Sequence, residues 1–430
     1  MKQRNIVGLK GHPVTFDDIT DKPLSDLIES CETPQLYLCA PLDKMSREYV
    51  EQPLKKGWNF ARPYIHKFRS PIFERHNRTV AVKLAGESWL PGCVTAAAAR
   101  LAWQELGHDW FEATGLPLLN TPSKTGQAWL WKALPRDRHF PALSDDVAAL
   151  IKSNSPQHRI EIFEPDYSGP EYAYDGRWMY AALCYLDRLP VGEAYQTRRF
   201  DPYTPGWYRV RVTVPDDWEH IGLIPCPVEK NGTPTWEYPN TPGQVFEVWV
   251  SEPELTFALK HWRIEVLEGW AFHRGRPLER WRNIIVELRQ NARNEYARAA
   301  YREILNHTIG SFHSNTYERE LIVDNAAYRV LVEKFGYQGV QVLERLKGGN
   351  RRVLTREVMA DKLSIYMPHW SATVWALERA RIAQHAMMTA RANLIEIRGD
   401  AIYSKTRLPF VDNKNLGQIR FQGEGVRNGR

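Results

Sequence analysis

Residues 172–192 read YAYDGRWMYAALCYLDRLPVG, and this stretch decides how the rest of the 430-residue sequence is interpreted. Its start predicts a strand over 172–175, and the apolar run that follows predicts a helix over 178–189. Asp175 therefore lies at the end of a strand and just before a helix. A carboxylate in that position can bind a hard metal ion, although helix capping explains most such residues.

A candidate partner for Asp175 is Asp400, in the segment 393–404, NLIEIRGDAIYS. This segment predicts two short strands around a tight turn at Gly399. An ordinary turn Asp is the simpler interpretation of the spacing alone. Two carboxylates on adjacent strands could instead hold two Mg²⁺ ions about 3.5–4 Å apart for in-line phosphoryl transfer.

An Arg-rich segment, 278–313, lies between the two carboxylates in the sequence. Its helical periodicity breaks near Asn291, which predicts two antiparallel helices. Arg298, Arg302 and Asn306 recur every fourth residue, so they share one helix face and could bind a triphosphate. A solvated basic face is the alternative interpretation.

The other segments predict an α+β protein. A strand over 79–84 and an Ala-rich helix over 94–106 indicate a small α/β unit near the start of the chain. Thr121-Pro122-Ser123 is typical of a helix start. Further predictions are a strand over 159–163, strands joined by turns over 195–268, a helix over 371–388 and a frayed end over 423–430.

This order of elements, together with three short motifs, resembles family B DNA polymerases, especially the protein-primed phage and plasmid type. The first palm motif of that family reads D-x-x-S-L-Y-P, and Asp175 and Tyr180 keep its spacing. The second, K-x-x-x-N-S-x-Y-G, is similar to REILNHTIG at 302–310, with Ile309 in place of Tyr. The third, Y-x-D-T-D-S, is similar to EIRGDA at 396–401, where Asp400 is kept and Arg398 replaces the first Asp.

Flanking segments, from TPSKTG at 121–126 to NLGQIRFQGEG at 415–425, extend the resemblance over about residues 120–425. The resemblance implies that Asp175, Asp400 and the Gly176 carbonyl bind Mg²⁺, with Mn²⁺ as an alternative. It also implies that Tyr180 packs under the sugar and excludes a 2′-hydroxyl. The predicted nucleotide contacts are Tyr180, Arg298, Arg302, Asn306 and Gly310. An Arg at 398 beside two metals would oppose their binding.

The implied fold is a polymerase palm with an antiparallel sheet and two-helix fingers. The predicted regions are an N-terminal α/β unit at 1–120, a first palm segment at 121–195, a β-rich insertion at 196–268, fingers at 269–315, and a second palm segment with a truncated thumb at 316–430. The family's proofreading nuclease begins with D-x-E, and the first 120 residues contain no such triplet. By position alone, that unit is interpreted as a degenerate exonuclease-like fold.

A candidate DNA-binding segment lies upstream, at 55–78, where cations alternate with aromatic residues. Cations can contact phosphates while rings stack on bases, as in a groove for single-stranded nucleic acid. The alternative is that about half of these rings belong to the core. The predicted DNA-binding residues are Lys55, Lys56, Arg62, Lys67 and Arg69.

Composition and cysteine spacing argue against a zinc-binding, secreted or membrane-spanning protein. The 57 Lys and Arg against 51 Asp and Glu give a modest net charge of +6, compatible with a polyanionic partner. The five cysteines are scattered and show no zinc-ligand spacing, which indicates reduced thiols. The sequence shows neither a signal peptide nor a membrane-spanning stretch, so a cytoplasmic protein is expected.

The resemblance to family B DNA polymerases therefore implies a DNA-directed DNA polymerase, a nucleotidyltransferase without proofreading that serves a phage or mobile element. Its expected partners are primer-template DNA and deoxynucleoside triphosphates. The alternative function is a weakened or inactive polymerase-fold subunit that binds nucleic acid in a replication complex. A second polypeptide that supplies the thumb, the nuclease or the priming function is a further hypothesis.

Overall fold

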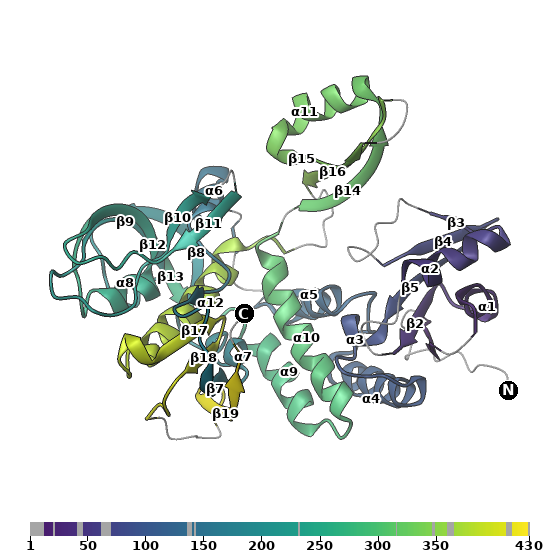
Figure 1. The fold of residues 1–430 in the computed structure, drawn as a ribbon, viewed down its shortest axis with the longest axis horizontal. Helices are drawn as coiled ribbons and strands as arrows, with labels where there is room; N and C mark the ends of the chain where they lie inside the picture. The colour runs from purple at the N-terminus through teal and green to yellow at the C-terminus, as the bar shows by residue number, and fades with distance from the viewer. Residues whose placement is uncertain are drawn as a thin grey trace. The chain divides into compact units, whose positions relative to one another are not determined.

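The computed structural model describes residues 13–19, 22–40, 46–61, 70–135, 140–141, 143–230, 233–314, 316–345, 349–358, 365–409 and 415–428. The chain divides into two compact units. Unit 1 comprises Met1–Lys132 and Asn283–Ile365, and unit 2 comprises Ala133–Arg282 and Tyr366–Arg430. Figure 1 labels most of the helices and strands of both units.

Unit 1 begins with a mixed five-stranded sheet in the order β1-β2-β5-β4-β3. The first three strands in this order run parallel, and the last two join antiparallel. Their bounds are β1 (Thr15–Asp18), β2 (Gln35–Cys39), β3 (Asn59–Phe60), β4 (Ile72–Arg75) and β5 (Arg78–Leu84). The strand predicted over 79–84 is confirmed as β5. Its Val80, Val82 and Leu84 alternate into a core shared with α1 (Leu24–Ser30).

The Ala-rich helix is confirmed as α4 (Ala96–Thr114), which is longer than predicted. The Thr95 side chain caps its start, and Gly115 ends it at a φ of 66°. Trp103, Leu106 and Trp110 recur at helical spacing and are buried, so the apolar stripe continues beyond residue 106. Shorter helices of this unit are α2 (Arg47–Glu51), the 3₁₀ helix η1 (Gln52–Lys56) and α3 (Ala85–Ser88).

The helix predicted to begin at residues 121–123 is α5 (Pro122–Ala133). The two helices predicted over 278–313 are confirmed as α9 (Glu279–Asn291) and α10 (Glu295–Phe312). The Asn294 side chain caps α10 by accepting hydrogen bonds from Tyr296 N and Ala297 N. Glu105 of α4 accepts bonds from the backbone of residues 293 and 294, which fixes the connection between the two helices.

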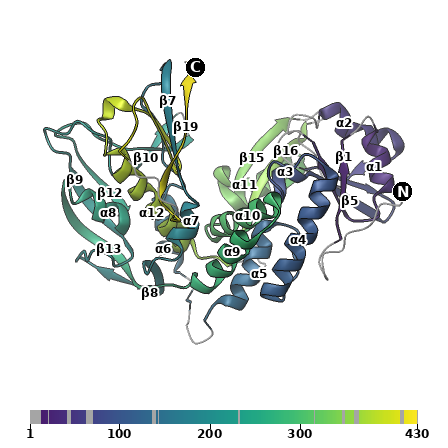
Figure 2. The same ribbon diagram turned by 90° about the horizontal axis from the view of Figure 1, so that it is seen from below.

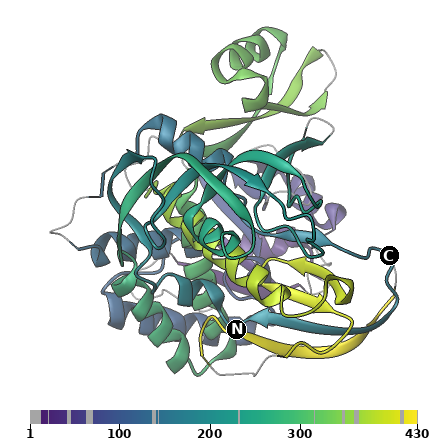
Figure 3. The same ribbon diagram turned by 90° about the vertical axis from the view of Figure 1, so that its left-hand side faces the viewer.

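A small α/β segment that the sequence analysis did not predict follows α10. Its three strands are antiparallel in the order β14-β16-β15. The bounds are β14 (Thr316–Val323), β15 (Val340–Arg345) and β16 (Arg351–Val358). Helix α11 (Asn325–Gly339), capped by Asp324, packs against these strands, as the green segment of Figure 3 shows.

Unit 2 contains the β-rich region predicted over 195–268. Its four-stranded antiparallel sheet has the order β12-β9-β13-β8, and β10 pairs with β11. The bounds are β8 (Leu189–Thr197), β9 (Gly206–Thr213), β10 (Cys226–Lys230), β11 (Thr233–Glu237), β12 (Val245–Ser251) and β13 (Arg263–Gly275). The short helix α8 (Glu252–Ala258) between β12 and β13 was not predicted.

The second sheet of unit 2 carries both candidate carboxylates. It is antiparallel throughout, in the order β19-β7-β18-β17-β6. The bounds are β6 (Ile160–Ile162), β7 (Gly169–Gly176), β17 (Leu394–Arg398), β18 (Ala401–Ser404) and β19 (Ile419–Arg427). Figure 2 shows β7 and β19 side by side. Two further helices of this unit are α6 (Asp145–Ser153) and α12 (Pro368–Ala386), which confirms the helix predicted over 371–388.

Two sequence predictions are wrong in this unit. The helix expected over 178–189 is only the five-residue α7 (Met179–Leu183), and β8 begins at Leu189. Trp178, which precedes α7, has a left-handed conformation with φ 46°, and turns follow α7. The apolar run is therefore divided into a left-handed residue, a short helix and turns. The end expected to fray over 423–430 is ordered through Arg427, because β19 pairs with β7 along its length.

All five cysteines are free thiols, four of them buried and Cys226 partly buried. Within the ranges that the structure describes, no helix is both long enough and apolar enough to cross a membrane.

Candidate active site

Asp175 lies at the end of β7, directly opposite Ala401 of β18 and Arg420 of β19. Residues directly opposite each other in an antiparallel sheet point to the same face, so Asp175 and Arg420 share one face. The Asp175 carboxylate accepts a hydrogen bond of 2.8 Å from the Gln422 side chain, and the Arg420 guanidinium lies 3.4 Å from its Oδ2 atom. The Asp175 side chain is 26% exposed, which leaves it accessible from solvent.

Asp400 lies in the tight turn between β17 and β18, after Gly399, which has a φ of 61°. Gly176 N donates a 3.0 Å hydrogen bond to the Asp400 backbone carbonyl. The Asp400 Oδ2 atom is only 3.1 Å from the point where a side chain on residue 176 would begin. The fold therefore brings Asp400 against Gly176, the residue after Asp175.

The candidate donor atoms are oxygens, the kind that Mg²⁺ prefers. They come from the carboxylates of Asp175 and Asp400 and from the backbone of Gly176. Among the described residues, no group of three or more His, Cys, Asp or Glu side chains is arranged to hold a metal ion. Because successive residues of a strand face opposite sides of the sheet, the Asp400 carboxylate lies on the side that residue 176 faces, whereas Asp175 shares the other side with Arg420.

Tyr180 of α7 is held by two residues that the sequence analysis did not identify. Its hydroxyl donates to Glu378 Oε2 of α12 at 3.2 Å and contacts His158 Nδ1 at 3.2 Å. Burial, followed by the negative charges of Glu378 and Asp400, raises the pKa of Tyr180 above its ordinary value. The hydroxyl therefore stays neutral and oriented. The only sequence signal for Glu378 is a single acidic residue inside an apolar helix.

Arg398, at the position of the missing carboxylate of the third motif, is paired locally. Its guanidinium lies 2.6 Å from Oε1 of Glu396, two residues earlier on β17. Arg427 of β19 also binds Glu396, and it binds Glu171 at 3.0 Å. Burial would raise the pKa of Glu396, but the hydrogen bonds from Arg427 and Arg398 hold it below its ordinary value. Two carboxylates therefore offset these two cations.

The predicted triphosphate contacts lie on α10, in unit 1. Arg298 donates to the Ala292 carbonyl at 2.6 Å and so secures the start of the helix. Arg302 is exposed and makes no side-chain hydrogen bond or ion pair with the part of the chain that the structure describes. Asn306 Oδ1 is buried with no hydrogen-bond partner there. A side chain added at Gly310 would meet nothing within 4 Å. On this helix, the Arg302 cation is therefore exposed to a ligand, whereas the Asn306 oxygen is unpartnered among the described residues but buried.

Of the predicted DNA-binding residues, Lys55 and Lys56 are exposed on η1, and Lys56 pairs with Asp26 of α1. Arg62, Lys67 and Arg69 lie outside the described residues. Two of the interleaved rings, Trp58 and Phe73, are buried in the core of the N-terminal sheet. This agrees with the alternative that some of the aromatic pattern serves packing.

Comparison with known proteins gives a likeness in fold. No protein-family model matches the sequence, and no curated protein matches it in sequence. The orthorhombic crystal form of phi29 DNA polymerase matches with a TM-score of 0.60 and 13% identity over 91% of this chain and 76% of that chain. Its ternary complex with primer-template DNA and incoming nucleotide substrates matches with a TM-score of 0.59, at 13% identity, over 91% of this chain and 77% of that chain.

The phi29 polymerase structure complexed with single-stranded DNA also matches with a TM-score of 0.59, at 13% identity, over 91% of this chain and 75% of that chain. Identity this low shows the fold alone. At that level, the resemblance predicted from the motifs is supported: the chain is a mixed α+β protein with several antiparallel sheets and a DNA polymerase-like fold.

Proposed function

We propose that this chain catalyses template-directed DNA synthesis and lacks proofreading. The observation that carries the proposal is the polymerase-like fold, in which the motif residue Asp400 contacts Gly176, the residue after Asp175. The similar phi29 structures include complexes with primer-template DNA and nucleotide substrates. We therefore propose primer-template DNA and deoxynucleoside triphosphates as the substrates of this chain.

Mg²⁺ fits the donor set, because Asp175, Asp400 and the Gly176 carbonyl supply only oxygen ligands. When bound, the metal would lower the pKa of the attacking 3′-hydroxyl and offset charge on the pyrophosphate leaving group. The chain's own role is to hold the two carboxylates on adjacent strands of a rigid antiparallel sheet. Gln422 contributes by orienting the Asp175 carboxylate from β19.

The nucleotide contacts follow from the residues without internal partners. Arg302 would bind the triphosphate as a bidentate donor, and the unpartnered oxygen of Asn306 would accept a hydrogen bond from the nucleotide or from a water bound to it. Tyr180, oriented through Glu378 and His158, would present its ring to the sugar and select against a 2′-hydroxyl.

Primer extension with purified protein, all four deoxynucleoside triphosphates and Mg²⁺ tests this proposal. Asp175→Asn keeps the shape of the side chain and removes its charge, so extension should fall about 10²-fold or more while the melting temperature changes little. Asp187→Asn is the matched control, because Asp187 is 47% exposed and its one ion pair with the described residues is a long one, 3.9 Å, to Arg274. Equal extension by both variants would contradict the assignment of Asp175.

The second candidate function is a polymerase-fold subunit that binds nucleic acid without turnover. The observation that favours it is Arg420, whose guanidinium lies 3.4 Å from the carboxylate that the metal would need. Arg420→Gln distinguishes the two candidates. If the chain is a polymerase, this variant should need less Mg²⁺ for half-maximal extension, because Asp175 loses a competing cation. DNA binding without extension, in wild type and variant alike, would favour the second candidate.

A further inference from the structure

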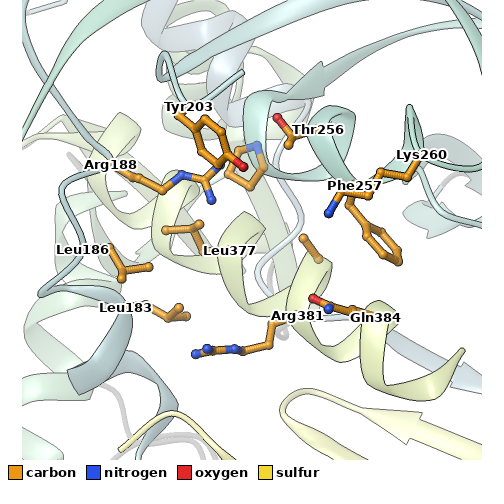
Figure 4. A pocket seen from close by; sticks show the side chains of 12 residues that line it. Leu183, Leu186, Arg188, Tyr203, Thr256, Phe257, Lys260, Leu377, Arg381 and Gln384 are labelled. Carbon is orange, nitrogen blue, oxygen red and sulfur yellow. The ribbon is translucent and has the colours of Figure 1, made fainter. Parts of the chain in front are cut away.

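Unit 2 contains a pocket with a volume of about 240 Å³ that is separate from the carboxylate pair. Its walls come from the connection between α7 and β8, from helices α8 and α12, and from Tyr203. Figure 4 shows Arg188 beside Tyr203 on one side of the pocket and Arg381 with Gln384 on another. The volume suits a small organic molecule and is too small for a polynucleotide.

The lining contains three cations and no acidic side chain: Arg188, Lys260 and Arg381. Arg188 is neutralised, because both oxygens of the fully buried Glu252 accept hydrogen bonds from it, at 2.6 and 2.8 Å. Glu252 also accepts bonds from Tyr203 N and the Thr256 hydroxyl. Glu252 therefore balances the charge of Arg188, and among the described residues Lys260 and Arg381 have no carboxylate partner.

Arg381 of α12 is a partly buried cation without a counter-charge. Among the described residues no carboxylate lies within ion-pair distance of its guanidinium, whose one polar contact is Met179 Sδ at 4.0 Å. Burial lowers the pKa of Arg381 below its ordinary value. Arg379, two residues earlier, shows the usual solution for a buried arginine, since it binds Glu254 at 2.7 and 3.1 Å. Leaving a cation unpaired is costly, so an anionic ligand would stabilise this site.

Lys260 adds a second positive charge at the rim of the pocket. It is exposed and makes no ion pair with the described residues. The other half of the lining is apolar and includes the buried residues Leu183, Leu377 and Phe257. An anion that enters this pocket would therefore meet two cations on its charged end and aliphatic or aromatic carbon on its other end.

We propose that this pocket binds a small amphipathic anion, a molecule with one phosphate or carboxylate group on a compact apolar body. The charged group would be bound by Arg381, with Lys260 at the entrance, and the apolar body would pack on Leu183, Leu377 and Phe257. The proposal is independent of nucleotide transfer, since none of these residues belongs to the proposed catalytic or nucleotide set.

Titration calorimetry on the full chain tests the proposal with three matched probes. Phenyl phosphate carries both features, inorganic phosphate carries only the charge, and phenol carries only the apolar body. We expect saturable binding of phenyl phosphate, tighter than that of either fragment. Arg381→Met should weaken it roughly tenfold or more, the loss of one charge-assisted contact, and Lys260→Met should weaken it less.

Arg209→Met is the control, because Arg209 lies on β9, is 45% exposed and is paired with Glu268. It removes the same charge at a position outside the pocket lining and should leave phenyl phosphate binding unchanged. Arg381→Lys, which keeps the charge, should retain most of the affinity and guards against a general effect of substitution. Absence of saturable binding, equal affinity for phenol, or undiminished affinity in Arg381→Met would each overturn the proposal.

Discussion

Gly126→Ala should destabilise unit 1, and Gly310→Ala should stabilise it. Gly126 lies in α5, and a side chain added there would begin 1.9 Å from Thr308 Oγ1 and 3.1 Å from the Ile304 carbonyl, both on α10. Thr308 is fully buried and its hydroxyl already donates to that carbonyl, so it has little freedom to move. Gly310 also lies in α10, but a side chain added there would meet nothing within 4 Å.

Both substitutions therefore gain helix propensity, but only the side chain added at Gly126 clashes with its neighbours. Replacing a helical Gly with Ala gains about 1 kcal/mol, which is the whole effect expected at Gly310. Overpacking at Gly126 costs ~1–3 kcal/mol and, with a backbone carbonyl among the clashing atoms, we place it at or above the upper end of that range. The net loss in unfolding free energy for Gly126→Ala is then about 2 kcal/mol or more. At ~2–4 °C per kcal/mol, a difference of about 3 kcal/mol between the two variants corresponds to a difference in melting temperature of roughly 6–12 °C.

Thermal unfolding followed by circular dichroism measures this difference. Thr308→Ala provides a rescue test, because it removes the nearest clashing atom. In the double variant, some of the stability lost in Gly126→Ala should be recovered, with a coupling free energy of about 1 kcal/mol. If Gly126→Ala is as stable as Gly310→Ala, or if the double variant shows no recovery, the close packing of α5 on α10 is refuted.

Three further substitutions test unit 2. Burial lowers the pKa of His369 from 6.5 to about 3. The free energy of unfolding should therefore be highest above pH 6.5 and should decrease as the pH falls, by ~2 kcal/mol at pH 5. His369→Phe should abolish this pH-dependent loss. Glu254→Gln should lower the unfolding free energy by about 3–5 kcal/mol, because it leaves the buried Arg379 unpaired. Tyr180→Ala should raise ribonucleotide incorporation roughly tenfold or more, whereas Tyr180→Phe, which keeps the ring, should not.

Urea unfolding at neutral and acidic pH checks the first two of these predictions. An equal or steeper loss of stability with falling pH in His369→Phe than in wild type would contradict the first. For the second, Glu247→Gln is the control, because the ion pair of Glu247 with Arg211 is on the surface and should contribute little. Similar losses in both Gln variants would contradict it. Primer extension with ribonucleoside triphosphates checks the third, and unchanged sugar selection in Tyr180→Ala would contradict the role of Tyr180.

Much of the fold was predictable because local periodicity is strong. The alternation in β9 and β12 and the helical spacing in α4, α10 and α12 were read correctly from the sequence. The α7 region was not, since a continuous apolar run cannot reveal that Trp178 has a positive φ. The sheet β14-β16-β15 was missed because β16 pairs with both β14 and β15, and helix α11 separates these two strands in the sequence. Pairing between strands that are not neighbours in the sequence leaves no local signal.

The candidate site was predictable only where it follows a motif. Asp175, Gly176 and Asp400 were proposed from the resemblance to polymerase motifs, and the fold brings Asp400 against Gly176. Arg420 and Glu378 could not be identified in this way, because each meets the site through contacts about 200 residues or more apart in sequence. Arg420 reaches Asp175 because β19 pairs with β7, and Glu378 reaches Tyr180 because α12 packs against α7.

Single-nucleotide incorporation tests the central claim most directly. Four primer-templates that differ only in the templating base would each be incubated with the protein, Mg²⁺ and one deoxynucleoside triphosphate at a time. The account predicts extension with the complementary nucleotide on each template and loss of that extension in Asp175→Asn. DNA binding without extension, or extension that ignores the templating base, would contradict template-directed synthesis by this chain.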